Sequence, residues 1–150
     1  MNMEIETKDF GILKIEEESV LHFPEGLFAF EDVTEYVILK KEGRPQLWLQ
    51  SVRGKDPRFI LFDPSVILPE YRPKIPEGYL RNIRLQKGEP FGLFVVAVVP
   101  QDYAQTTVNL KSPVLINFSK RLGAQIILEE GDYPIRCRLF GEEKGRECPC

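Results

Sequence analysis

The chain has 150 residues, of which 43% are hydrophobic and 29% charged, and its formal net charge at pH 7 is −3. A chain of this length buries enough surface to fold as one domain without a covalent or metal staple. The mildly negative net charge is not that of a protein that binds a nucleic-acid backbone, which carries an excess of basic residues. We therefore expect no direct nucleic-acid partner.

The first residues, MNMEIETKDFG, lack the apolar core of a secretory signal. The longest apolar run, LFVVAVVP at 93–100, is much shorter than the roughly 20 residues that cross a bilayer. We therefore expect a cytoplasmic protein with no membrane partner.

Short runs of alternating apolar residues recur along the chain and predict β-strands. They are rich in Val, Ile and Phe and are separated by Gly, Pro, Asp and Asn. Strands this short and evenly spaced are typical of an antiparallel barrel or sandwich. The expected strands lie near 5–7, 10–12, 20–23, 36–39, 47–49, 59–62, 91–99, 107–110, 114–118, 126–128 and 135–139.

Helix is expected in no more than two short places. Residues 76–86 read PEGYLRNIRLQ, with a proline in the first turn and apolar residues at helical spacing, and a single turn is expected around 64–68. We therefore expect a mainly β fold, a small antiparallel β-barrel-like or sandwich single domain over residues 1–140, with one or two short helices. The charged segment 141–150 is expected to be a flexible C-terminal tail.

The sequence offers no set of residues that catalysis or metal binding requires. His22 is the only histidine, and neither a nucleophile elbow nor a phosphate-binding glycine motif accompanies it. The acidic run EEE at 16–18 lacks the alternate spacing of a calcium loop. The closing ECPC lacks a second cysteine or histidine pair that would complete a tetrahedral site. We expect a protein that is not an enzyme and holds neither cofactor nor metal.

The single tryptophan stands in PQLWLQS, at residues 45–51. If Leu47 and Leu49 face a core, the alternation turns Trp48 outward together with Gln50. Exposed tryptophans are enriched at interface hot spots, so this strand predicts a binding patch. The alternative, in which the proline-rich segment that follows covers Trp48, fits the pattern equally well.

Turn-forming residues are expected to have structural roles. Pro24 and Gly26 set a turn in HFPEGLFAFED, and Asp63 is expected to cap a helical turn that follows it. Each of these residue types favours a turn through its own backbone or side-chain chemistry.

The stretch TVNLKSPVLIN at 107–117 is expected to contain two strands separated by Lys-Ser-Pro. Pro113 cannot donate a ladder hydrogen bond at the entry of the second strand. Asn109 and Asn117 are expected to satisfy backbone groups where the ladder is interrupted, which favours a structural role over an active site.

Several of these stretches form an ordered series that resembles the FliW family of bacterial flagellar assembly factors. Each motif is weak alone, whereas the ordered set is specific and runs from about residue 10 to about residue 135. The motifs are FG-x-I/L at 10–13, FPEGL-x-x-FE at 23–31, WLQS at 48–51, DP at 63–64, P-x-Y at 69–71, VNL-x-x-P-x-x-IN at 108–117 and Q-x-IL at 125–128, followed by Tyr133.

The resemblance implies a non-enzymatic adaptor with a small antiparallel β-barrel-like fold. Such proteins bind flagellin in the cytoplasm and also bind the translational regulator CsrA. Once flagellin has been exported, the free adaptor sequesters CsrA and relieves its repression of flagellin translation. The mildly acidic balance fits a partner that grips RNA through basic groups.

On the family-like motifs we expect partner binding at Phe30, Glu31, Trp48, Gln50 and Ser51. One departure lies beside them, since the chain has Phe28-Ala29 where the family more often has Pro-Gly. That departure is expected to alter the turn before Phe30.

Two other readings remain open. One is a small-ligand-binding or enzymatic β-barrel, whose polar groups would converge at the mouth. Its candidate residues are Asn109, Asn117, Gln50 and Asp63. The other is a nucleic-acid-binding barrel, which predicts exposed aromatics interleaved with basic residues on one face. The basic residues of this chain are dispersed, so this reading ranks last.

Overall fold

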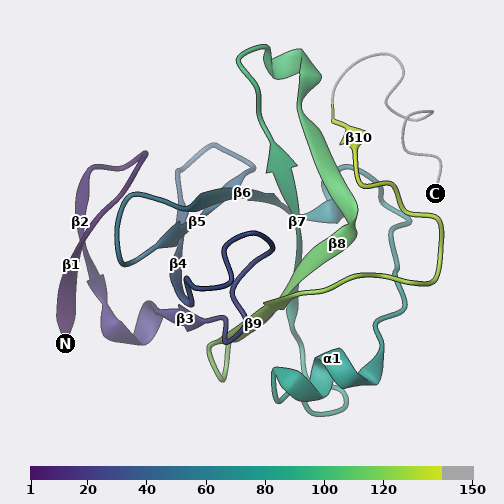
Figure 1. Cartoon of the computed structure of the whole chain (residues 1–150), viewed down its shortest axis with the longest axis horizontal. Helices are drawn as coiled ribbons and strands as arrows, with labels where there is room; N and C mark the ends of the chain where they lie inside the picture. Colours follow the sequence, from purple (N-terminus) through teal and green to yellow (C-terminus); the bar gives the residue numbers. More distant parts are fainter. Residues whose placement is uncertain (140–150) are drawn as a thin grey trace.

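A computed structural model describes residues 1–139 as a closed seven-stranded β-barrel with a two-stranded hairpin against one side (Figure 1). The expected mainly β class is therefore confirmed. The tail expected at 141–150 lies outside the described residues. The strands are β1 (Asn2–Glu6), β2 (Ile12–Glu16), β3 (Leu21–His22), β4 (Glu35–Lys40), β5 (Leu47–Ser51), β6 (Arg58–Phe62), β7 (Gly92–Val98), β8 (Thr107–Asn117), β9 (Leu122–Gln125) and β10 (Cys137–Arg138).

The barrel runs in the order β8-β7-β6-β5-β4-β3-β9 and closes where β9 pairs with β8. Its neighbouring strands are antiparallel except for β3 and β9, which meet in parallel through His22 and Leu122. β10 extends the sheet beyond β8, and β1 and β2 form a separate hairpin. Closure leaves the barrel strands without a free edge, which is the usual solution for an all-β fold of this kind.

Strands β8 and β9 each correct an expectation. Residues 107–110 and 114–118 were expected to be separate strands, whereas Thr107–Asn117 is one strand of 11 residues. Opposite β7, the register jumps from Val114 to Asn109 while β7 advances from Phe94 to Val96. The residues between them bulge out of this ladder, so a proline at position 113 interrupts no β7–β8 hydrogen bond. The strand expected at 126–128 is also wrong, because β9 ends at Gln125.

Helical structure is shorter than expected. Helix α1 (Glu77–Asn82) covers the first part of the expected 76–86 segment. It stops there because Arg84 adopts a left-handed φ of 56°, and the Leu85 N–H donates to the Leu80 carbonyl at 2.9 Å, the bond that closes a Schellman motif. Single 3-10 turns occupy η1 (Glu17–Ser19), η2 (Pro64–Val66) and η3 (Tyr103–Gln105).

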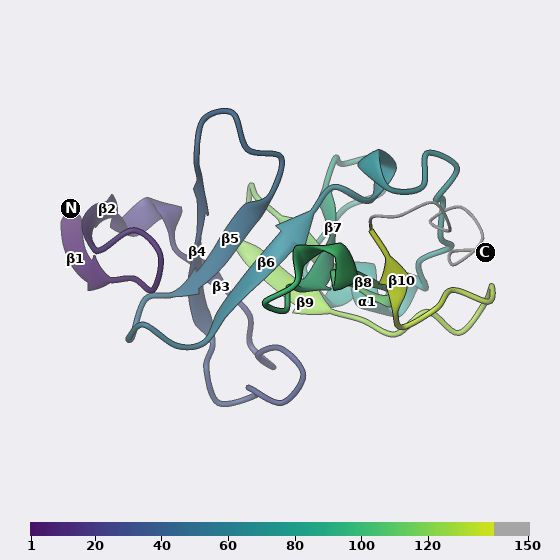
Figure 2. The ribbon, with the colours of Figure 1, turned by 90° about the horizontal axis from the view of Figure 1, so that it is seen from above.

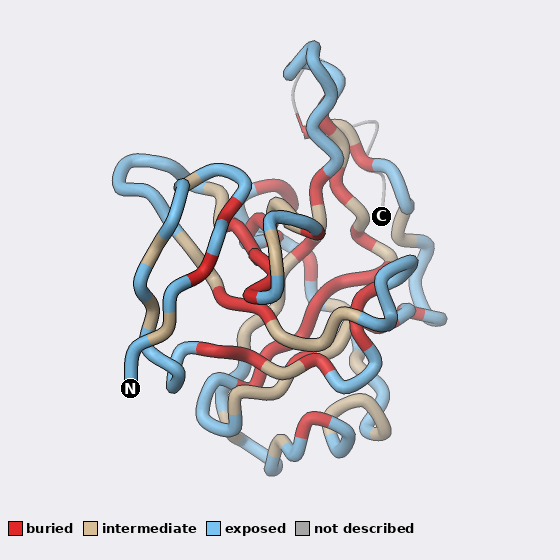
Figure 3. Tube along the Cα trace, turned by 60° about the vertical axis from the view of Figure 1, so that its left-hand side comes forward, coloured by how far each residue is buried: buried red, intermediate tan, exposed pale blue. Residues whose placement is uncertain are grey.

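The barrel interior is filled by side chains. Gly123 shows how closely they pack, because a Cβ there would lie 2.4 Å from the ring of Phe23. Buried residues follow the barrel strands, whereas the connecting loops are exposed (Figure 3). The buried interior side chains include Leu21, Phe23, Leu27, Tyr36, Leu49, Leu61, Val114 and Ile116.

Two further clusters lie on the outside of the barrel. The larger one joins β7 and β8 to the proline-rich segment and to residues 126–139, and there the Tyr71 hydroxyl donates to the Leu110 carbonyl at 2.7 Å. The smaller one joins the β1–β2 hairpin to the outer face of β4 through Ile5 and Val37. Figure 2 shows the hairpin as a separate layer beside β4.

Candidate functional site

The loop between β3 and β4, residues 23–34, crosses one end of the barrel (Figure 1) and projects beyond the strands in the side view (Figure 2). Its first part is a plug, because Phe23 and Leu27 are 0% and 1% exposed within the barrel core. Gly26 allows the backbone to turn sharply and lets residues 30–31 pass close to it. Its φ is +66°, and a Cβ there would lie 2.5 Å from the Phe30 carbonyl oxygen.

The tip of this loop is a tight turn over residues 27–30. The Phe30 N–H donates to the Leu27 carbonyl at 2.8 Å, and within the turn only Ala29 has a positive φ, of 73°. This combination defines a type II turn, which favours glycine at the position that Ala29 occupies.

Two side chains satisfy the remaining backbone donors of the tip. Glu31 Oε2 accepts from the Ala29 N–H at 3.0 Å, and Gln125 Oε1 accepts from the Phe28 N–H at 3.0 Å. The tip is therefore held in one conformation by bonds from within the loop and from β9.

This conformation presents two aromatic rings to the outside. Phe28 and Phe30 are each 43% exposed, and Phe30 rests edge-on against Phe59 with ring centroids 5.5 Å apart. Residues 23–34 contain three exposed acidic side chains and no Lys or Arg. The expected contact residues Phe30 and Glu31 therefore lie together on an exposed, acidic and aromatic tip.

Phe28 was not among the expected contact residues. The signal available in the sequence was an apolar side chain at a turn position, because a turn tip leaves little surface to cover a ring.

The other three expected contact residues do not lie on an open face. Trp48 is 8% exposed, and Gln50 and Ser51 are 0% exposed. The ring of Phe10 packs edge-on against Trp48 at 4.9 Å. The expectation that Trp48 lies on an open face is therefore wrong. The turn between β1 and β2, which contains Phe10, covers part of its ring.

Gln50 is a structural clamp. Its Oε1 accepts from the Lys8 N–H at 3.0 Å, and its Nε2 lies within hydrogen-bond distance of three carbonyls, those of Ser51, Gly54 and Lys55, at 3.0–3.1 Å. These bonds fasten the β1–β2 turn and the β5–β6 turn to the end of β5. Ser51 Oγ accepts from the Arg53 N–H at 3.1 Å within the same turn.

The two asparagines of β8 are engaged with backbone groups. Asn109 Oδ1 accepts from the N–H groups of Lys111 and Ser112, both at 3.0 Å, inside the bulge. Asn117 Nδ2 donates to the Ile83 carbonyl at 2.8 Å and ties β8 to the end of α1.

Asp63 also acts locally, since its Oδ1 accepts from the Ser65 N–H at 2.9 Å at the start of η2. Pro24 is the second residue of a turn in which the Gly26 N–H donates to the Phe23 carbonyl at 2.7 Å. Asn109, Asn117, Gln50 and Asp63 thus bind separate stretches of backbone and do not converge on a mouth.

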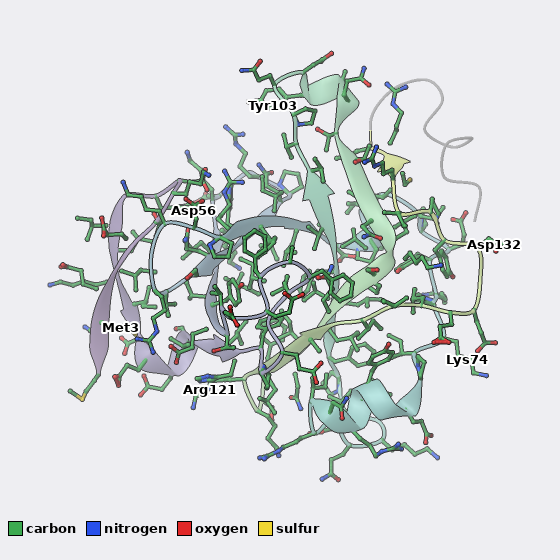
Figure 4. The ribbon with its side chains drawn as sticks, in the orientation of Figure 1. Met3, Asp56, Lys74, Tyr103, Arg121 and Asp132 are labelled. Carbon is green, nitrogen blue, oxygen red and sulfur yellow. The ribbon has the colours of Figure 1, made fainter. Side chains whose placement is uncertain are left out.

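Two open cavities flank α1, and neither contains the four polar residues of the ligand-binding alternative. One, of about 480 Å³, is lined by residues that include Lys74, Tyr79 and Glu130. The other, of about 350 Å³, includes Leu80 and Phe91. Lys74 lies on the opposite side of the barrel from Met3, in the N-terminal hairpin (Figure 4).

His22 lies on β3 with its Nδ1 3.8 Å from Glu35 Oε2. Residues 1–139 contain no group of three or more histidine, cysteine, aspartate or glutamate side chains placed to share a metal ion. In the same part of the chain, no helix is long and apolar enough to cross a bilayer.

A filled barrel that presents an exposed, conformationally fixed aromatic loop belongs to the class of small β-barrels suited to contact another protein rather than to enclose a ligand. Residues 4–139 match the family model described as FliW protein. The chain belongs to the FliW protein family.

Similar proteins agree with this assignment. The flagellar assembly factor FliW of Caldicellulosiruptor saccharolyticus is 39% identical over 136 residues, which cover 91% of this chain and 90% of that protein. The protein of the same name from Leptospira interrogans is 34% identical over 142 residues, covering 93% and 95%. A crystal structure of the flagellar assembly factor FliW superposes with a TM-score of 0.88 at 31% identity, covering 94% and 99%. The family and fold expected from the ordered motifs are confirmed.

Proposed function

We propose that this protein is a non-enzymatic cytoplasmic adaptor that binds flagellin and antagonises a CsrA-like translational regulator. A role in flagellar assembly is supported by its family and by relatives named flagellar assembly factors. The two partners come from the motif resemblance. In this proposal, flagellin binds the adaptor while flagellin is made faster than it is exported. Export of flagellin then releases the adaptor, which sequesters the regulator.

The observation that carries the adaptor role is the exposure of Phe28 and Phe30 on a fixed turn at the end of a filled barrel. Half-exposed rings on a pre-organised loop can bury apolar area against a partner at a small entropic cost. A filled interior favours this mode over small-ligand binding, because the interior residues leave the ligand no place inside the barrel.

Isothermal titration calorimetry with the purified full-length chain tests the proposal. CsrA and flagellin from the same organism are titrated separately, and then CsrA is titrated into the adaptor saturated with flagellin. We expect dissociation constants in or below the low-micromolar range and a weaker apparent affinity for CsrA when flagellin is present. Binding of either protein only in the high-micromolar range overturns its part of the proposal.

A further inference from the structure

We propose that the tip of the β3–β4 loop is a receptor for an arginine side chain of a protein partner. The guanidinium stacks on the exposed rings of Phe28 and Phe30 and pairs with the Glu31 carboxylate. This inference deepens the proposed function, because it rests on that loop being a partner-binding surface and names the chemistry that the surface recognises.

The carboxylate of Glu31 is held in place beside the two rings. Its Oε2 accepts from the N–H of Ala29, the residue between Phe28 and Phe30, at 3.0 Å. Its Oε1 has no hydrogen-bond partner within residues 1–139. A partner cation therefore meets a carboxylate already fixed next to an aromatic surface, so less side-chain entropy is lost on binding.

Both rings have surface to offer. Each is 43% exposed, and Phe28 makes no ring contact within the described part of the chain, whereas Phe30 uses one edge against Phe59. A planar cation can lie on an open ring face, where the negative π-electron density attracts it.

The charges around the tip favour a cationic partner. Glu25, Glu31 and Asp32 are exposed, and residues 23–34 hold no basic side chain. Two arginines, one in the turn between β5 and β6 and one at the start of β6, are already paired. Arg53 Nη2 lies 2.5 Å from Glu35 Oε1, and Arg58 Nε lies 2.5 Å from Asp9 Oδ2.

The chemistry selects arginine among cations. A guanidinium is planar, stacks on aromatic faces and can bond a carboxylate through two parallel N–H groups, whereas an ammonium is a compact and strongly hydrated point charge. A nucleic-acid phosphate would instead be repelled by the three carboxylates. The partner contact site is therefore expected to present an arginine at its centre.

The first test measures the affinity of CsrA and flagellin for two loop variants. Phe28→Ala removes an exposed ring. Glu31→Gln removes the charge but keeps an oxygen that can accept from the Ala29 N–H, so the turn is retained. We expect each variant to weaken binding of at least one partner by roughly tenfold or more.

Matched controls separate the tip from general effects. Glu42→Gln removes an exposed charge from the turn between β4 and β5, at the other end of β4 from the loop. Phe118→Ala removes another ring, which is 50% exposed. Phe118 lies in the turn between β8 and β9, whereas the loop tip is bonded to Gln125 at the opposite end of β9. Both controls are expected to bind within about twofold of wild type. Loop variants that bind like these controls, with unfolding midpoints close to wild type, overturn the inference.

A second test does not depend on either proposed partner. The peptide acetyl-Gly-Arg-Arg-Gly-amide and its citrulline counterpart, which has the same shape without the charge, are titrated into isotopically labelled protein and followed by NMR. We expect the arginine peptide alone to shift the amides of residues 27–32, and Glu31→Gln to abolish the shifts. If wild type binds neither CsrA nor flagellin, the proposed function fails while the peptides still decide the inference. Equal shifts with both peptides, or none at the loop, overturn it.

Discussion

The Lys8 N–H and Gln50 Oε1 lie 42 residues apart in the chain and are joined by a hydrogen bond of 3.0 Å. This bond fastens the turn between β1 and β2 to the end of β5. Around it, Asp9 accepts two hydrogen bonds from Arg58, at 2.5 and 3.0 Å, and Phe10 packs on Trp48. The turn between β1 and β2 therefore covers the face of β5 that contains Trp48, which the sequence predicts as a partner-binding patch.

Gln50→Leu is expected to lower the free energy of unfolding by about 2–4 kcal/mol, because it keeps the side-chain volume but leaves one partly buried N–H donor and three carbonyls without their partner. Urea unfolding followed by circular dichroism measures the change. Gln101→Leu, at an exposed position, is the control and is expected to change stability by less than about 0.5 kcal/mol. Equal effects of the two substitutions would contradict the clamp.

Trp48→Ala is expected to cost stability rather than affinity. Truncating a buried tryptophan to alanine typically costs about 3–5 kcal/mol. The milder variant Trp48→Phe keeps most of the packing, so its affinity for CsrA and flagellin, measured by calorimetry well below its unfolding temperature, is expected to match wild type. A stable Trp48→Phe protein that has lost binding would place Trp48 in the interface after all.

Ala29→Gly is expected to stabilise the fold by about 0.5–1 kcal/mol, because glycine adopts a positive φ without the steric cost that a Cβ brings there, and this gain exceeds its larger loss of chain entropy. The unfolding midpoint in urea reports the gain. Ala104→Gly, in an exposed 3-10 turn, is the control and is expected to be neutral or destabilising. A loss of stability in Ala29→Gly would show that the turn does not strain Ala29.

Tyr36 is expected to make stability fall at alkaline pH. Burial raises the pKa of Tyr36 from 10.0 to about 12, so the folded state holds the phenolic proton more tightly than the unfolded state does. The contribution is complete below pH 10 and is lost as the pH rises toward 12, by about 1.4 kcal/mol at a pH of about 11. Unfolding free energies in urea at about pH 8 and pH 11 measure the loss.

Tyr36→Phe separates this effect from other alkaline titrations. The Tyr36 hydroxyl has no hydrogen-bond partner within residues 1–139, so its removal is expected to cost little at neutral pH and to reduce the alkaline loss. Tyr103→Phe, at a position 72% exposed, should leave the alkaline loss unchanged. An identical pH dependence in Tyr36→Phe and wild type would refute the assignment.

Local sequence was sufficient for most of the strands, for the turns and for the family. A period of two reports an extended segment with two unlike faces, and this signal lies within each segment. The capping by Asp63 and the bonds of Asn109 to Lys111 and Ser112 were accessible for the same reason, because each joins residues no more than three apart. The ordered motifs placed the chain in the FliW family, which the comparisons confirmed.

Tertiary structure alone decided which faces remain open. Alternation shows that Trp48 faces away from Leu49, but not that a turn some forty residues earlier in the chain will cover it. The same limit applies to Thr107–Asn117, where a bulge accommodates the proline that locally indicates a break. It applies also to the tip of the β3–β4 loop, because the exposure of Phe28 depends on how that loop packs across the end of the barrel. Burial is set by contacts between distant segments, and these depend on strand order and closure rather than on the local pattern of residues.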